Sequence, residues 1–318
     1  MRTPLNSLYS VAELSKQAFH KYLKHKYAFE KKLSDLLIEV DILRSEHPGC
    51  GVEKMYHTLK PDFIGRDRFI DYMMFLGYRV KKSKNYVRTT IPAYYKYPNL
   101  IEGSIVSDIN QVWQSDITYI RIGEAYYYLV FILDVYSRKI VGYQASDHLR
   151  AQANVKALQM AFKQRKKKYF EGLIHHSDRG SQYISKEYTQ LLKDKGIAIS
   201  MGSHAMDNPY AERVNGTIKN EFLHHWDIRT LKDLKIKLKQ AVNYYNSRRI
   251  HNSLPEHQTP NAYERNLLNL LYRKRPTVNI YTDGYEKFSE ASSLFELQPK
   301  TDLGLHICPI VFENYSKT

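Results

Sequence analysis

The chain has 318 residues, 43% of them apolar, which allows two or three domains with a buried core and excludes wholesale disorder. Lysine and arginine number 48 against 33 aspartates and glutamates, and the net charge of +15 favours a polyanionic partner such as nucleic acid. The longest apolar run, residues 125–134, is too short to cross a bilayer, and the first residues form no hydrophobic signal core. The only two cysteines are far apart, which excludes a disulfide scaffold and a cysteine-based zinc site. We therefore expect a basic, cytoplasmic, multi-domain protein.

Residues 1–82 are expected to form a helical DNA-binding region. Apolar residues recur at helical spacing in a stretch of helix-forming residues that covers 11–46. Two short amphipathic segments, predicted at residues 52–59 and 66–76, fit a helix-turn-helix at about residues 51–77. A pair of short helices without a DNA role is the alternative interpretation.

A β-rich pattern begins after a connector. Residues 83–110 contain Pro92, Pro98 and Gly103 without a sustained period and are expected to form a linker. The predicted strands cover residues 112–122, 125–135, 138–145, 172–176 and 197–201. The predicted helices cover residues 151–164, 186–195 and 210–224. This order predicts an α/β core over residues 111–226, with a mixed five-stranded sheet and flanking helices.

The positive charge is densest after this core. Residues 213–275 hold 13 basic and 5 acidic side chains, and a further amphipathic helix is predicted at 231–245. We therefore expect residues 227–265 to be a basic helical extension of the core. The tail, residues 266–318, has no predicted role, and its acidic part from 276 onward resembles nothing known to us.

Three acidic residues stand where a carboxylate needs a partner. Asp116 lies inside the first predicted strand, where an unpaired charge is costly to bury. Asp178 directly follows the fourth strand, and Glu212 lies near the start of the last core helix. If the first and fourth strands are adjacent, the three carboxylates converge and repel one another, which favours a hard cation such as Mg2+. Two such ions about 3.5–4 Å apart promote phosphoryl transfer.

Each acid also has a structural interpretation. Asp116 could form a cross-strand ion pair, Asp178 could cap a turn, and Glu212 could offset a helix dipole. Asn208 followed by Pro209 predicts an N-cap that begins the last core helix and aims Glu212. The occurrence of all three acids in this order favours a shared site over three separate structural roles.

The motifs around these acids resemble a known family. QSDITY around Asp116, HSDRGSQY around Asp178 and NPYAERVNGTIKNEF around Glu212, followed by YNSRRIHNSLPEHQTPNAY, resemble the catalytic frame of bacterial insertion-sequence transposases of the retroviral-integrase (DDE) type. More narrowly, the chain resembles the second-frame product (OrfB) of the frameshifting two-frame group. The resemblance covers residues 113–263, and residues 47–82 more weakly resemble the small helical DNA-binding domain of that group.

The resemblance implies an RNase H-like core and a transposase that cleaves transposon ends and transfers strands into target DNA. It implies that Asp116, Asp178 and Glu212 are the catalytic, metal-binding triad for two Mg2+ or Mn2+ ions. It also implies a homo-oligomer that synapses two DNA ends at the bacterial nucleoid, acting alone or fused with an upstream-frame partner. The chain departs from the family's pattern where 33 residues separate Asp178 from Glu212, slightly fewer than usual, with the shortening expected in residues 202–207.

Other polar side chains are expected to contact DNA. The family's basic residue falls on Lys219, and a spacing of seven residues puts it on one helix face with Glu212. The expected DNA-binding residues are Lys219, Asn215, His176, Arg66, Arg68, Arg248, Arg249 and His251. Neighbouring His175 and His176 point to opposite sides of a strand, with no cysteine nearby, so zinc ligation is not expected. Solvated helix faces are the alternative for Asn215 and Lys219.

Two rival functions stay open from the sequence. One is a sequence-specific DNA-binding regulator whose RNase H-like core is only a scaffold, and the other is a metal-dependent nuclease. The presence of all three acids argues against the scaffold. The basic extension and the added amino-terminal region argue against a simple nuclease.

Overall fold

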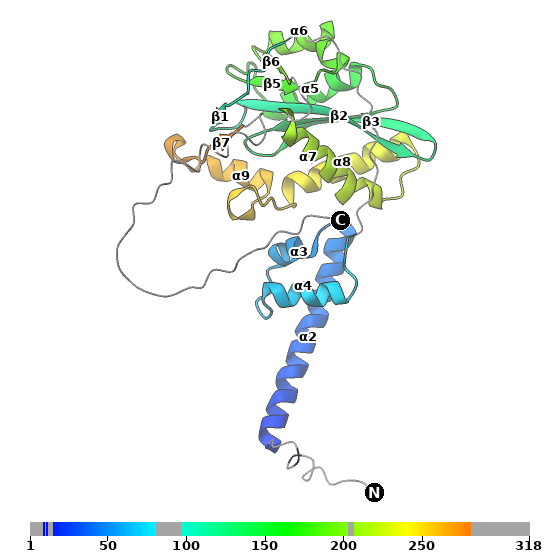
Figure 1. Ribbon diagram of the computed structural model, residues 1–318, viewed down its shortest axis with the longest axis vertical. Coiled ribbons are helices and arrows are strands. Elements are labelled where there is room, and N and C mark those ends of the chain that lie inside the picture. Colours follow the sequence, from blue (N-terminus) through cyan, green and yellow to red (C-terminus); the bar gives the residue numbers. More distant parts are fainter. Residues whose placement is uncertain (1–8, 10, 12–14, 81–96, 203–206, 281–318) are drawn as a thin grey trace, which may run out of the picture. The chain divides into compact units, whose positions relative to one another are not determined.

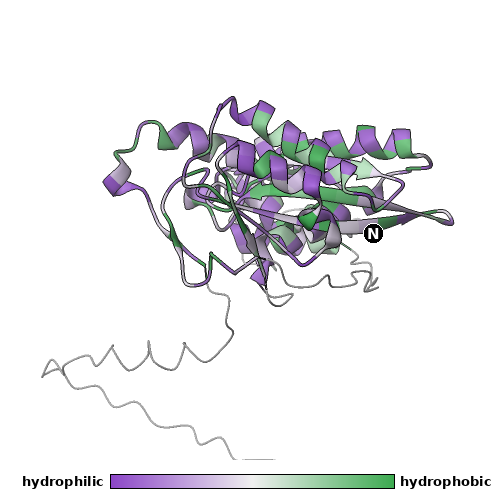
Figure 2. Ribbon diagram, turned by 90° about the horizontal axis from the view of Figure 1, so that it is seen from above, coloured by the Kyte–Doolittle hydropathy of each residue, from purple (hydrophilic) through white to green (hydrophobic). Residues whose placement is uncertain are grey.

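The computed structural model describes residues 9, 11, 15–80, 97–202 and 207–280. Of the predicted features, the acidic tail from residue 281 onward, much of the linker and most of the loop at 202–207 lie outside these residues. In the described part, no helix is both long enough and apolar enough to cross a membrane. The helices instead alternate between hydrophilic and hydrophobic residues (Figure 2).

The amino-terminal region is helical, as predicted. It contains α2 (Lys16–Glu46), α3 (Val52–Leu59) and α4 (Arg66–Phe75). The hydroxyl of Ser15 accepts a hydrogen bond from the Ala18 N–H and so begins α2. Fully buried Met55, Phe69 and Met73 pack α3 against α4. The helical character of this region is confirmed, and its resemblance to a helix-turn-helix stays a prediction.

The core is a mixed five-stranded sheet (Figure 1), as predicted. Its strands are β2 (Val112–Ile122), β3 (Ala125–Asp134), β4 (Ile140–Ser146), β5 (Ile174–Ser177) and β6 (Ala198–Met201). The spatial order is β4-β3-β2-β5-β6. Strand β2 is antiparallel to β3 and parallel to β5, and β5 is parallel to β6. The first and fourth strands of the sheet are therefore neighbours, which is the condition that the carboxylates required.

Helices cover both faces of the sheet. They are α5 (Gln152–Arg165), α6 (Lys186–Asp194), α7 (Pro209–Glu221) and α8 (Leu231–Ser247). Strand β3 explains why the sequence shows an unbroken apolar run: Leu129, Phe131 and Leu133 belong to the hydrophobic cluster that includes α7 and α8, whereas Val130 and Ile132 belong to the cluster of α5 and α6. A strand buried on both faces has no polar positions to alternate with.

Apart from shifts of one or two residues at the ends of several strands and helices, three details differ from the sequence prediction. Helix α7 ends at Glu221 rather than 224, because a short 3-10 turn follows at Leu223–His225. A second, two-stranded sheet pairs β1 (Ile105–Val106), inside the predicted linker, with β7 (Val278–Asn279). One more helix, α9 (Pro260–Leu267), follows α8 and begins with a Thr259 cap and a proline in its first turn. Such short strands carry no period that a sequence reader can detect.

Candidate active site

Asp116 and Asp178 each follow one member of a residue pair that joins two parallel strands. Ser115 of β2 pairs with Ser177, the last residue of β5; Asp116 is the next residue of β2, and Asp178 directly follows the end of β5. Both side chains are partly exposed. Asp178 also accepts a hydrogen bond from the Gly180 N–H at 3.0 Å, so its structural role as a turn cap coexists with its place beside Asp116.

Glu212 lies in the first turn of α7, and that turn is fastened to β2 by two buried amides. Gln114 is fully buried, and its Oε1 accepts hydrogen bonds from the Tyr210 N–H at 3.1 Å and the Ala211 N–H at 3.4 Å. Asn208 donates from Nδ2 to the Ser115 carbonyl at 2.8 Å. These bonds fix the turn of the helix that carries exposed Glu212 against the strand that carries the first aspartate.

The first residue of α7 was predicted correctly, but the side chain that accepts hydrogen bonds from its first turn was not. Asn208 is the N-cap residue and Pro209 follows it at the first turn, as expected, yet the Asn208 side chain forms no capping bond. Gln114 supplies that acceptor from the strand instead. Sequence reasoning missed Gln114, and the only local signal was a polar amide at an inward position of a strand otherwise suited to burial.

The charges of the three acids act on one another. Burial raises the pKa of Asp116 to about 8, with further contributions from the charges of Asp178 and Glu212. Burial also raises the pKa of Asp178, against the opposing hydrogen bond from Gly180. The pKa of Glu212 is raised by burial and by the charge of Asp178. The charge of Asp178 thus raises the pKa of both other acids, and neighbouring carboxylates of this kind are groups that a cation would stabilise.

The acids are near one another without forming a closed ligand set. Among the described residues, no group of three or more histidine, cysteine, aspartate or glutamate side chains is gathered closely enough to hold a metal ion. The donors of the triad are all carboxylate oxygens, which suit Mg2+ or Mn2+ and not a soft metal. The carboxylate oxygens suit a hard cation, and the three acids interact electrostatically without forming a complete set of metal ligands.

Asn215 and Lys219 contact β2 at this site. Asn215 donates from Nδ2 to Oδ2 of Asp116 at 2.7 Å. The Lys219 ammonium donates to the Thr118 hydroxyl at 2.7 Å, and burial lowers its pKa despite the nearby charge of Asp116. Neither side chain is simply a solvated helix face. Both lie beside the first aspartate or its strand neighbour Thr118.

His176 lies inside the core. Its side chain is fully buried in β5, its Nδ1 lies 2.8 Å from the Ser200 hydroxyl of β6, and burial lowers its pKa to about 4. Neighbouring His175 is equally enclosed and lies 2.9 Å from the Tyr188 hydroxyl. The enclosed imidazole therefore links β5 to β6, and its side chain has no exposed surface.

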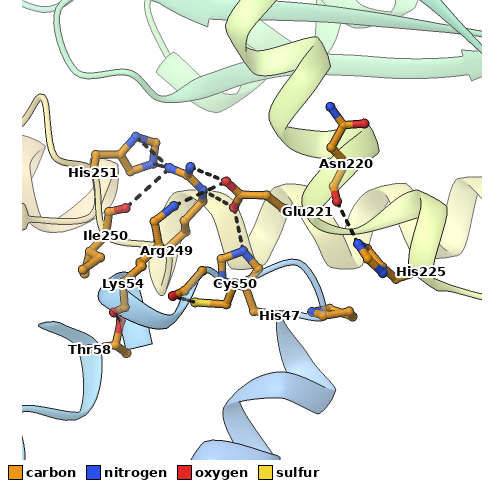
Figure 3. Close-up of polar contacts among 12 residues, drawn as sticks. His47, Cys50, Lys54, Thr58, Asn220, Glu221, His225, Arg249, Ile250 and His251 are labelled. Atoms are coloured by element: carbon orange, nitrogen blue, oxygen red, sulfur yellow. Dashed lines mark hydrogen bonds and ion pairs between the residues drawn. The ribbon is translucent and has the colours of Figure 1, made fainter. Parts of the chain in front are cut away.

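The expected basic cluster near residue 250 is largely occupied by internal partners (Figure 3). Arg249 donates to both carboxylate oxygens of Glu221 at 2.7 Å. His251 is buried against Arg249, with 3.3 Å between Nδ1 and the guanidinium. Only Arg248 is exposed, and it forms an ion pair with Glu46. Sequence reasoning did not single out Glu221, because an acid in a basic helical segment has no distinctive local pattern.

The two arginines of α4 also differ from each other. Arg66 is about half exposed, with a side-chain exposure of 52%, and pairs with Asp67 at 2.9 Å. Arg68 lies over the Phe29 ring, with its guanidinium 4.7 Å from the ring centroid. The Arg66 guanidinium is thus held by an exposed ion pair, whereas the Arg68 guanidinium packs α4 against α2.

Comparisons with known proteins agree on the core. Two models described as Integrase core domain match the chain, one over residues 107–205 and the other over residues 195–260. The Insertion element IS600 uncharacterized 31 kDa protein of Shigella sonnei is 29% identical over 256 residues, 76% of this chain and 92% of that protein. The Transposase for insertion sequence element IS904 of Lactococcus lactis subsp. lactis (strain IL1403) is 34% identical over 175 residues, 53% of this chain and 67% of that protein.

Coverage and structural likeness vary among the other matches. Some relatives named as transposases are covered over only about half of their own length, 47% and 53% in two cases. Among solved structures, the HTLV-2 integrase catalytic core domain in complex with magnesium (trimeric form) is 19% identical, with a TM-score of 0.39. That match covers 52% of this chain and 99% of the solved one.

Proposed function

Because the chain belongs to the DDE-type insertion-sequence transposases, a family of polynucleotidyl transferases with an integrase core domain, we propose that it cleaves DNA at transposon ends and joins the ends to target DNA. Its mixed sheet with flanking helices is the integrase catalytic core fold, which is RNase H-like. The observation that carries the proposal is the position of Asp116 and Asp178 one residue beyond the paired Ser115 and Ser177, with Glu212 in electrostatic contact.

The triad is proposed to bind the metal. Asp116, Asp178 and Glu212 would hold Mg2+ or Mn2+, most simply two ions, and the bound metal supplies activation of the attacking oxygen and stabilisation of the leaving oxygen. Asn215 orients the Asp116 carboxylate through its hydrogen bond. Lys219 keeps a positive charge beside the same carboxylate, where it can bind a substrate phosphate.

The remaining DNA contacts are proposed by position. Arg66 and Arg248 are exposed and can exchange their ion-pair partners for DNA phosphates. Arg68, Arg249 and His251 are engaged inside the protein and are proposed to support the DNA-binding surface from beneath. His176 is proposed to act in the same indirect way, since it is enclosed between strands.

Each segment of the chain is proposed to have its own role. We assign residues 1–82 to DNA binding through the helix-turn-helix-like pair α3 and α4, 83–110 to a linker, 111–226 to catalysis and 227–265 to a basic extension. Residues 266–318 receive no role. The partners proposed are transposon ends, target DNA, further copies of the chain in a synaptic complex and an upstream-frame product, and the place of action is the bacterial nucleoid.

The experiment uses the full chain and a labelled duplex that ends in the transposon's own terminal sequence. Asp178→Asn and Glu212→Gln should abolish Mg2+-dependent cleavage and joining while DNA affinity stays within about twofold, because each change removes a charge from the site and little volume. Ser181→Ala, an exposed residue near the same loop, is the matched control and should retain activity. Strand transfer by either acid variant at the wild-type rate would refute the proposal.

Two further outcomes separate the rival functions. Salt-dependent DNA binding without any metal-dependent product, in the wild type as well as in the variants, would indicate a regulator with a scaffold core. Nicked products without joined products, even when a free 3′ end and target DNA are supplied, would indicate a nuclease. Joined products that require all three carboxylates are the expected result.

A further inference from the structure

Strand β2 and helix α7 are joined by a repeating set of polar contacts. On the strand, Gln114, Asp116 and Thr118 are alternate residues and therefore point to one face of the sheet. Gln114 contacts the backbone of Ala211, Asp116 contacts Asn215, and Thr118 contacts Lys219. Each step of two residues on the strand is thus matched by a step of four residues on the helix, and we call this set the β2–α7 ladder.

The match has a geometric cause. Two residues of a strand advance by about 6.6 Å, at about 3.3 Å per residue. Four residues of a helix advance by about 6.0 Å, at 1.5 Å per residue. The two repeats are close enough for three successive rungs to form where α7 lies against β2 (Figure 1). Sliding the helix by one residue, about 1.5 Å, would break the rungs together.

The ladder is built from groups that are expensive to bury. Gln114 and Asn208 are 0% and 3% exposed, and each forms hydrogen bonds between β2 and the start of α7. Each also leaves one buried atom, Gln114 Nε2 and Asn208 Oδ1, without a hydrogen-bond partner among the described residues. An apolar interface would avoid this desolvation cost. What the polar contacts add is direction, because a hydrogen bond weakens steeply when its distance or angle departs from the preferred geometry.

The axial position of α7 decides how the triad can act. Glu212 follows Ala211 directly on the helix, and Asp116 lies between the other two rung residues of β2. Because Asp116 is carried by β2 and Glu212 by α7, the separation of their carboxylates depends on where the ladder holds α7 along the strand. We infer that Gln114 and Thr118 are positioning residues, which set the register of α7 on β2 and thereby the affinity of the triad for its divalent metal. This inference rests on the proposed function of the site.

The test measures metal binding apart from catalysis. In the full chain, the Mn2+ concentration that gives half of the maximal Tm increase is determined by thermal unfolding. Gln114→Met should raise that concentration about tenfold, which is the lower end of the loss seen when partners of metal ligands are removed. Thr118→Val should raise it several-fold, and Thr118→Ser, which retains the hydroxyl, should restore it to within about twofold of the wild type.

A stability-matched control separates positioning from general loosening. Asn246 is another buried amide, and it bonds both the N–H and the carbonyl of Ile140 far along the chain from α7. Asn246→Leu should lower Tm without changing the Mn2+ midpoint. Hydrogen exchange gives a second readout, since Gln114→Met should speed exchange at the Tyr210 and Ala211 amides that it leaves without an acceptor.

The possible outcomes separate a failure of the positioning role from a failure of the proposed function. An unchanged Mn2+ midpoint in both Gln114→Met and Thr118→Val, or an equal shift in Asn246→Leu, would overturn the positioning role even if the wild type transfers strands. Metal-independent strand transfer by the wild type would instead overturn the proposed function. Shifted midpoints in the ladder variants, with rescue in Thr118→Ser, support the inference.

Discussion

Arg249 holds Glu221 through two parallel hydrogen bonds, from Nε to Oε2 and from Nη2 to Oε1, each 2.7 Å long. The same carboxylate lies 2.6 Å from Nε2 of His47 and 3.3 Å from the ammonium of Lys54 (Figure 3). Burial alone would raise the pKa of Glu221, but the hydrogen bonds from Arg249 and His47 and the surrounding positive charges outweigh it and lower the pKa. Glu221 is the last residue of α7, the helix whose first turn carries Glu212, so one carboxylate ties the amino-terminal region and residue 249 to α7.

Removing the charge of Glu221 should destabilise the fold. Glu221→Gln keeps the shape of the side chain but leaves the enclosed guanidinium of Arg249, 11% exposed, without its counter-charge. Breaking one partner of a buried pair costs about 3–5 kcal/mol, so the free energy of unfolding in urea should fall by that amount. Glu46→Gln, which removes the exposed pair with Arg248, is the control and should cost less than about 1 kcal/mol. Equal losses in the two variants would contradict the prediction.

Gly49 allows the backbone that follows α2 to approach the end of α7 at Glu221. Its N–H donates to the Glu221 carbonyl at 2.8 Å, and a Cβ at residue 49 would lie 2.4 Å from the Glu221 Cα. Backbone atoms cannot move aside as a flexible side chain can, so Gly49→Ala should lower the free energy of unfolding by about 1–3 kcal/mol. Gly51, two residues away, has open space at its Cβ position. Gly51→Ala should therefore change stability by less than about 1 kcal/mol, and a larger loss there than at Gly49 would contradict the steric argument.

Stability should fall as the solution becomes acidic, beginning near the ordinary histidine pKa of 6.5. Burial, assisted by the charges of Arg249 and Lys54, lowers the pKa of His251 to about 2, although Glu221 opposes the shift. Between pH 6.5 and 2 the unfolded chain therefore binds a proton that the folded chain does not, so this contribution is complete above pH 6.5 and is lost as the pH falls. A buried histidine whose pKa is lowered in this way reduces the free energy of unfolding by about 2 kcal/mol between pH 6.5 and 5.

Urea unfolding at pH 7, 6 and 5 measures this dependence. His251→Gln should flatten the slope by about one proton, because the remaining groups titrate as before. Glu221 adds a loss of the same sign at lower pH, since a carboxyl with a lowered pKa stabilises the fold above its unfolded value and loses that contribution as it is protonated. An unchanged slope in His251→Gln would show that this histidine is not the group responsible.

The sequence was informative where a pattern is local and where a single physical rule acts. Strand β2 and helix α3 have the predicted bounds because period and composition decide them. Asp116 and Asp178 could be placed together only on the condition that the first and fourth strands are adjacent, and the parallel pairing of β2 with β5 meets that condition. Gln114 could not be recognised, since its partners are backbone groups of residues 210 and 211, which no side-chain pattern reveals.

The sequence was less informative where a charged side chain was assigned a role before its partners in the fold were known. Arg249 and His251 were predicted to contact DNA because they stand in a basic run. In the structure, Arg249 instead binds the carboxylate of Glu221, 28 residues earlier, and contacts the ring of His251. Composition reports that a charge exists and not whether it is already neutralised. The same reasoning separates Arg66 from Arg68, which look alike in sequence and differ in surroundings.

That difference gives a final prediction for the amino-terminal helices. Arg66→Gln should weaken DNA binding and lower the slope of log affinity against log salt by about 0.9, the effect of one lost phosphate contact, with little change in Tm. Arg68→Gln should lower Tm, because the guanidinium over Phe29 helps to pack α4 on α2, and should change the salt slope less. Fluorescence anisotropy at 50–200 mM salt and thermal unfolding, measured on both full-length variants, decide the matter. An unaltered salt slope in Arg66→Gln would mean that this face of α4 does not carry the DNA.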